Sequence, residues 1–145
     1  MKTIVCLVDF SDAAPKVIEQ AQAFAQAFNA RVVLLHVAPK EHVVMDLAMV
    51  SPIVTQAPSP EAIKADFERL SALAQSLTQA GIAPQVEQLK DADVESLVTK
   101  CEQLEADLIV VGSHRHGALY QWLTGSMTSG VLKSARCAVL VVPAG

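Results

Sequence analysis

The stretch TIVCLV, residues 3–8, places continuous β-branched and apolar side chains near the start of the chain, directly before Asp9. Similar apolar runs follow: RVVLLHV at residues 31–37, LIVV at residues 108–111 and AVLVV at residues 138–142. A weaker run at residues 85–89 alternates in polarity, as an edge strand does. Continuous apolar runs of this length are typical of parallel strands that are covered on both faces.

Helical patterns fill the intervals between these runs, and most begin at a residue type that caps helices. The expected helices run from Ser11 or Asp12 to about Phe28, from Ser59 to a stop at Gly81, from Asp93 to about Leu104, and over residues 126–135. Pro15 falls in the first turn of the first helix, where its fixed backbone angle suits a helix start.

The order of elements is therefore strand and helix in strict alternation, from strand one to strand five. Such alternation predicts an α/β fold: a doubly wound, three-layer sandwich with a parallel sheet and helices on both faces. We expect one domain over residues 1–145. In such a fold the ligand crevice lies at the carboxyl ends of the strands, where the winding reverses. Asp9 and the residues from Gly112 onward fall at that edge.

Composition excludes several classes of protein. Hydrophobic residues make up 52% of the 145-residue chain, which argues against disorder. The net charge of −4 and the absence of a basic run argue against a protein that coats nucleic acid. No stretch approaches the roughly 18 uninterrupted apolar residues of a membrane span, and no signal-peptide pattern is present. We therefore expect a cytoplasmic protein.

The three cysteines, Cys6, Cys101 and Cys137, are odd in number and show no C-x-x-C spacing. This disfavours a disulfide framework or a zinc site, and each is expected to be a buried, inert thiol. His36 ends a buried strand and is expected to be a hydrogen-bonded core residue. His114 and His116 lack a third ligand with suitable spacing, so no metal site is expected.

The connection over residues 39–58 shows no regular pattern but is unusually apolar. Two interpretations stay open: a short helix or flap packed on the core, or a lid over the crevice or part of a subunit contact.

The segment that follows the fourth run, GSHRHGALYQWLTGS at residues 112–126, is the most informative motif. Gly112 lets the backbone leave the strand closely, and Gly125 and Ser126 open the last helix, whose free N–H groups favour an anion. The alternative is an ordinary loop with a capped helix start. No G-x-G-x-x-G follows the first strand, so a dinucleotide-binding Rossmann enzyme is not expected.

At these residues the chain resembles the universal stress protein family, which shows Gly-x2-Gly-x9-Gly-Ser/Thr after its fourth strand. Gly112 and Gly125 have that spacing, and Ser126 follows. Four further segments are similar to the family: IVCLVDFS at residues 4–11, LLHV at 34–37, ADLIVVGS at 106–113 and CAVLVVP at 137–143. The resemblance covers essentially the whole chain.

The resemblance implies a five-stranded parallel sheet of order 3-2-1-4-5, usually in a homodimer. In the nucleotide-binding branch of the family it implies ATP in the crevice, with or without Mg²⁺. Carried over by position, Asp9 would contact the ribose or adenine side, and the backbone of Val37 would hold adenine. Val111 and Gly112 would line the nucleotide. Gly125, Ser126 and Met127 would bind its phosphates.

The sequence departs from the family pattern at Arg115, where the second glycine belongs. Glycine there allows close approach to phosphate, so a bulky side chain could block the pocket. Arginine could instead donate hydrogen bonds to the phosphates, and Gly117 could supply flexibility nearby. Both alternatives stay open.

We therefore expect a regulatory or sensor protein of the stress response that binds ATP or a related adenine nucleotide. Efficient catalysis is not expected, because no general base is evident beside the phosphate loop, although slow hydrolysis stays open. The alternative is an interaction module in which Arg115 closes the phosphate site. A homodimer is expected through the edge strand of residues 139–142 (Val139, Leu140, Val141 and Val142), because an uncovered apolar edge pairs readily with a second copy. An unidentified protein partner is also open.

Overall fold

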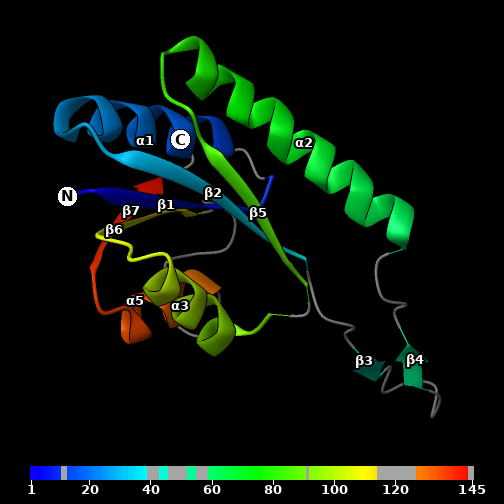
Figure 1. Ribbon diagram of the computed structural model, residues 1–145. Coiled ribbons are helices and arrows are strands. Elements are labelled where there is room, and N and C mark those ends of the chain that lie inside the picture. The colour runs from blue at the N-terminus through cyan, green and yellow to red at the C-terminus, as the bar shows by residue number, and fades with distance from the viewer. Residues whose placement is uncertain are drawn as a thin grey trace.

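The computed structural model describes residues 1–10, 13–38, 43–45, 52–54, 59–90, 92–113 and 127–143. Strands and helices alternate along the chain, with one short pair of strands inserted after the second strand (Figure 1). The elements are β1 (Thr3–Val8), α1 (Ala14–Phe28), β2 (Arg31–Ala38), β3 (Val43–Met45), β4 (Pro52–Val54), α2 (Pro60–Gln79), β5 (Gln85–Lys90), α3 (Val94–Gln103), β6 (Leu108–Ser113), α5 (Met127–Ser134) and β7 (Ala138–Pro143).

The main sheet contains five strands in the order β5-β2-β1-β6-β7, and every neighbouring pair is parallel. Counted along the chain without the short pair, this is the order 3-2-1-4-5, which confirms the expected fold class. β1 lies between β2 and β6, so the winding reverses at β1. The crevice of such a sheet lies outside the carboxyl ends of the central strands.

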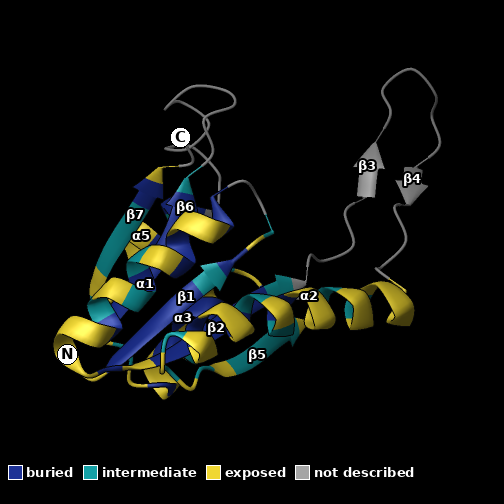
Figure 2. Cartoon of the chain, turned by 90° about the horizontal axis from the view of Figure 1, so that it is seen from above, coloured by how far each residue is buried: buried dark blue, intermediate teal, exposed yellow. Residues whose placement is uncertain are grey.

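Helices cover both faces of the sheet and divide the core into two clusters. α1 and α2 lie on one face, and α3 and α5 lie on the other (Figure 1). Alternate residues of β1 serve the two clusters: Ile4 and Cys6 face α1, whereas Val5 faces α3. All three are fully buried, as expected for a strand covered on both faces. Figure 2 shows this burial concentrated in the central strands.

The helix starts agree with the sequence in two cases and differ in one. Ser59 accepts a hydrogen bond from the backbone N–H of Ala62, and Asp93 accepts one from Ser96, as capping residues do. α1 instead has Ala13 at its N-cap, without a side-chain cap, so the prediction of Ser11 or Asp12 as the cap is wrong. Pro15 favours a helix start at this point even without a capping side chain, because its fixed backbone angle suits the first turn.

The connection after β2 contains regular structure that the sequence pattern did not predict. β3 and β4 pair antiparallel with each other, with Val44 opposite Ile53, and form a separate two-stranded sheet. The sequence assigned no regular element to this connection, because three-residue strands are too short to show a recognisable period. Two interpretations of this connection stay open: a flap packed on the core, or a lid or subunit contact. The side chains that would distinguish them lie outside the described residues.

The described part of the chain contains no helix that is both long enough and apolar enough to cross a membrane.

Candidate functional site

The ends of three adjacent strands bring the predicted nucleotide residues to one edge of the sheet. Val8 of β1 lies opposite His36 of β2, and Leu7 lies opposite Val111 of β6. Asp9 follows β1 directly, and its side chain is exposed. The registers therefore place Asp9, the last residues of β2 and the last residues of β6 side by side at the predicted crevice.

Gly112 occupies a position where a side chain has no room. A Cβ added there would lie 2.6 Å from the Cβ of Ala13 and 3.4 Å from a methyl group of Val17. Both neighbours belong to the start of α1, so the glycine lets α1 approach β6 closely. This close approach is a steric requirement for glycine, at the point where the chain leaves the sheet.

A buried hydrogen bond joins the last helix to the same point. The Thr128 hydroxyl, in the first turn of α5, donates to the carbonyl oxygen of Gly112 over 3.3 Å. Thr128 is 8% exposed. The start of α5 is thereby tied to the end of β6. Free N–H groups in the first turn of a helix are suited to bind a phosphate.

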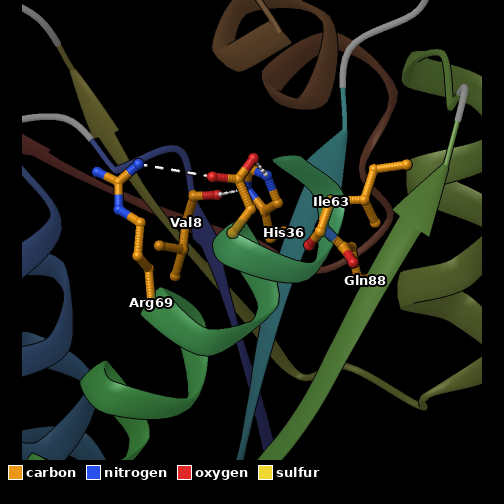
Figure 3. Close-up of polar contacts among 6 residues, drawn as sticks. Val8, His36, Ile63, Arg69 and Gln88 are labelled. Carbon is orange, nitrogen blue, oxygen red and sulfur yellow. Dashed lines mark hydrogen bonds and ion pairs between the residues drawn. The ribbon is translucent and has the colours of Figure 1, made fainter. Parts of the chain in front are cut away.

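A polar cluster lies beside Asp9 and joins β2 to α2 (Figure 3). The Nδ1 atom of His36 is hydrogen-bonded to the carbonyl oxygen of Val8 at 2.7 Å. This confirms the prediction of a hydrogen-bonded core histidine. The Nε2 atom of His36 lies 3.6 Å from a carboxylate oxygen of Asp66, and Arg69 lies 3.5 Å from the other oxygen of that carboxylate.

Phe10 completes this cluster in an unusual backbone conformation. Its φ of 58° lies in the left-handed region, which residues other than glycine adopt at a cost of order 1–3 kcal/mol. The ring packs at 4.5 Å from the His36 ring, and the Arg69 guanidinium lies 4.3 Å above it. These two contacts pack Phe10 against β2 and α2 directly after Asp9.

The structure places five of the eight predicted site residues at this edge. Asp9 lies after β1, Val37 is half-buried in β2, Val111 and Gly112 end β6, and Met127 is the first residue of α5. Arg115, Gly125 and Ser126 lie outside the described residues, as do His114, His116 and the other residues of that loop. Within the described ranges, no group of three or more His, Cys, Asp and Glu side chains could hold a metal ion.

Sequence reasoning placed Phe10 in the segment after strand one without giving it a role, and it missed Asp66, Arg69 and Thr128. One signal was present for Asp66, which lies three positions after Ile63 and four before Leu70, on the face of α2 that meets the sheet. A carboxylate on such a face requires a polar partner. Nothing in the sequence pattern distinguished Thr128 from other residues near a helix start.

The cysteines lie away from this edge. Cys6 and Cys101 are buried as expected, and burial raises the pKa of Cys6 to about 12 and that of Cys101 to about 11. Cys137 is only partly buried, which corrects the prediction for that residue because it lies between α5 and β7 at the border of the core. Burial also raises its pKa, so all three thiols are protonated at neutral pH.

Comparison with known proteins shows a family whose members match nearly the whole chain. The model of the universal stress protein family matches residues 1–143. A universal stress protein of Methanocaldococcus jannaschii is 29% identical, over 97% of this chain and 81% of that protein.

Solved structures of universal stress proteins share the fold. One from Archaeoglobus fulgidus in complex with dAMP has a TM-score of 0.72 at 21% identity, covering 98% of each chain. One in complex with cAMP has a TM-score of 0.73 at 22% identity, covering 99% of this chain and 98% of that one. An Arabidopsis thaliana family member with AMP bound has a TM-score of 0.65 at 15% identity, covering 99% and 92%.

Proposed function

The chain belongs to the universal stress protein family, and from this premise we propose that it binds ATP or a related adenine nucleotide as a regulatory protein of the stress response. The observation that carries the proposal is the meeting of Asp9, Val37 and Gly112 at the carboxyl ends of three adjacent parallel strands. Family members solved with cAMP, dAMP and AMP support the choice of an adenine nucleotide.

The proposed contacts divide between the two ends of the nucleotide. Asp9 accepts hydrogen bonds from the ribose or adenine side, and the backbone of Val37 holds the adenine edge. Val111 and Gly112 line the middle of the nucleotide. The phosphates lie against the start of α5, where Gly125, Ser126 and Met127 offer backbone N–H groups and one hydroxyl. Mg²⁺ would accompany ATP through the phosphate oxygens.

Arg115 decides between this proposal and its rival. A guanidinium that donates to the phosphates replaces backbone contacts with charge-assisted hydrogen bonds, whereas one that fills the pocket leaves an interaction module without a ligand. The departure from glycine at this position is the specific observation that favours the rival. We propose that the protein acts in the cytoplasm as a homodimer, in either case without efficient catalysis.

The test begins with the purified protein. After denaturation, any released nucleotide is identified by absorbance and chromatography, and the stripped protein is titrated with ATP, AMP and cAMP by calorimetry. We expect saturable binding of at least one of them. Absence of binding even at millimolar concentration contradicts the proposal and favours the interaction module.

Two variants then locate the site. Ser126→Ala combined with Gly125→Val is expected to weaken binding by at least tenfold, because it removes a phosphate donor and narrows the backbone approach. Arg115→Gly separates the two roles of the arginine: weaker binding identifies Arg115 as a ligand, and tighter binding identifies it as an obstacle. Lys64→Ala, on the exposed side of α2, is the control that leaves affinity unchanged.

A further inference from the structure

His36 lies between two of the proposed nucleotide contacts, because Asp9 follows its strand partner Val8 and Val37 follows His36 itself. The side chain is 7% exposed, and its Nδ1 atom is 2.7 Å from the Val8 carbonyl oxygen. A carbonyl oxygen only accepts hydrogen bonds, so Nδ1 carries the proton in this contact. The ring thereby holds the peptide group that leads into Asp9.

The other ring nitrogen is directed at α2 without completing a hydrogen bond. Nε2 is buried and has no hydrogen-bond partner, and the nearest carboxylate oxygen of Asp66 is 3.6 Å away. With the proton on Nδ1, a neutral ring presents a lone pair to this carboxylate. The two groups therefore lie in contact without a hydrogen bond, and the Arg69 guanidinium, which pairs with Asp66 and lies over the Phe10 ring, completes the link to α2.

Few of the described contacts hold the amino-terminal half of α2 to the rest of the fold. The buried residues of α2, which are Leu70, Ala74 and Leu77, all lie in its carboxyl-terminal half. In residues 60–69 only Ile63 and Asp66 are half-buried, and Figure 2 shows the rest exposed. Besides the Asp66 contact, a long hydrogen bond of 3.5 Å from the Gln88 side chain to the Ile63 carbonyl attaches this half to the sheet (Figure 3). The Arg69 guanidinium also lies 4.3 Å from the centre of the Phe10 ring.

We propose that His36 is a positioning residue that couples the nucleotide site to the amino-terminal half of α2. The proposal rests on the proposed function. Nδ1 sets the Val8 peptide and with it the backbone of Asp9 and Phe10. Asp66 and Arg69, which contact the rings of His36 and Phe10, transmit the position of that backbone to the helix. Nucleotide binding orders residues 64–69 of α2, and by reciprocity anchoring of this segment tightens nucleotide binding.

Hydrogen exchange with and without saturating AMP tests the coupling, because amide protection reports local opening of a helix. In the wild-type chain, AMP is expected to slow exchange of residues 64–69 about fivefold or more. In Asp66→Ala this slowing is lost, and AMP affinity falls by about threefold or more. Glu68→Ala, which removes an exposed carboxylate two positions away, behaves as the wild type.

Two amide variants separate the roles of the ring nitrogens. Asn at position 36 places an N–H near the position of Nδ1, and Gln reaches the position of Nε2. We expect His36→Asn to retain AMP affinity within about threefold while losing the coupling to α2, and His36→Gln to lose about tenfold in affinity. Melting temperatures of both are measured, because a purely structural role would lower affinity in proportion to stability and without this division.

The outcomes are distinct. AMP binding with equal protection of residues 64–69 in the wild type and in Asp66→Ala overturns the coupling and leaves the proposed function standing. Equal affinity loss in the two amide variants overturns the positioning role. A wild-type chain that binds no adenine nucleotide overturns the proposed function and this inference together.

Discussion

Gly112 combines a packing role with a proposed contact to the nucleotide. Its lack of a side chain lets α1 approach β6, and it lies at the proposed middle of the nucleotide. We expect Gly112→Ala to lower the free energy of unfolding by about 1–3 kcal/mol, because the added Cβ would meet that of Ala13, which has no rotamer with which to move away. Chemical denaturation followed by circular dichroism measures the loss.

The double variant Ala13→Gly with Gly112→Ala provides the control. Glycine is tolerated at an N-cap, so Ala13→Gly alone is expected to cost little. If the clash is the cause, the double variant recovers much of the stability lost in Gly112→Ala. Strictly additive losses would show that steric overlap with Ala13 is not the reason for glycine at this position.

The buried thiols make stability sensitive to alkali. The pKa of Cys6 is raised to about 12 and that of Cys101 to about 11 from 9.0, so between pH 9 and 11 the unfolded chain loses thiol protons that the folded chain keeps. The free energy of unfolding therefore falls with rising pH in this window, by on the order of 1 kcal/mol per pH unit for each thiol.

Denaturation curves at pH 8, 9.5 and 11 measure this dependence. Cys101→Ala is expected to remove one thiol's share of the slope, although it also lowers stability at pH 8 by creating a cavity. A slope unchanged by the substitution would assign the alkaline loss to other groups. Below pH 9 the thiols contribute their full stabilisation, so the variant and the wild type should differ there by a constant amount.

At the scale of elements, one hydrogen bond holds the start of α5, where the phosphates are proposed to bind, against the end of β6. Thr128→Val removes the hydroxyl that donates to the Gly112 carbonyl and keeps the shape of the side chain. We expect a loss of about 1 kcal/mol in the free energy of unfolding and a several-fold lower AMP affinity, because the first turn of α5 is no longer held against the strand end. Calorimetry measures the affinity.

Thr128→Ser retains the hydroxyl and is the matched control. It is expected to keep most of the AMP affinity, with a small loss of stability from the missing methyl group. A Thr128→Val protein with the wild-type affinity would show that this hydrogen bond supports the fold alone.

At the scale of the whole molecule, β7 lies at one edge of the sheet and offers the surface for the proposed homodimer. Leu140 is half-buried against the α1 side of the core, and its neighbours along the strand are apolar. We expect the wild-type protein to have twice the 15.4 kDa mass of one chain in light scattering, and Leu140→Lys to shift it toward the monomer.

Leu73→Lys is the control, because Leu73 is also half-buried against the same cluster but lies on α2. It is expected to lower stability to a similar degree and to leave the mass of the dimer unchanged. A monomeric wild-type protein, or equal dissociation in both variants, would contradict a dimer through β7.

Local sequence determined the main strands and most helix ends. Runs such as residues 3–8 and 108–111 form buried strands because their β-branched side chains suit a sheet covered on both faces. Ser59, Asp93 and Gly81 mark helix boundaries through contacts within a few residues of themselves, and Gly81 has the positive φ expected of a helix stop. The strand order followed from resemblance to a family and is confirmed by the sheet.

Only the tertiary structure decided the features that depend on residues far apart in the chain. The β3–β4 pair, the contact of His36 with Asp66 and the steric need for Gly112 beside Ala13 all arise from neighbours that no local pattern reveals. Periodicity reports which face of an element is buried, and it carries no information about which partner lies opposite. For that physical reason the sequence predicted the edge that holds the candidate site, whereas the folded chain alone showed how that edge is built.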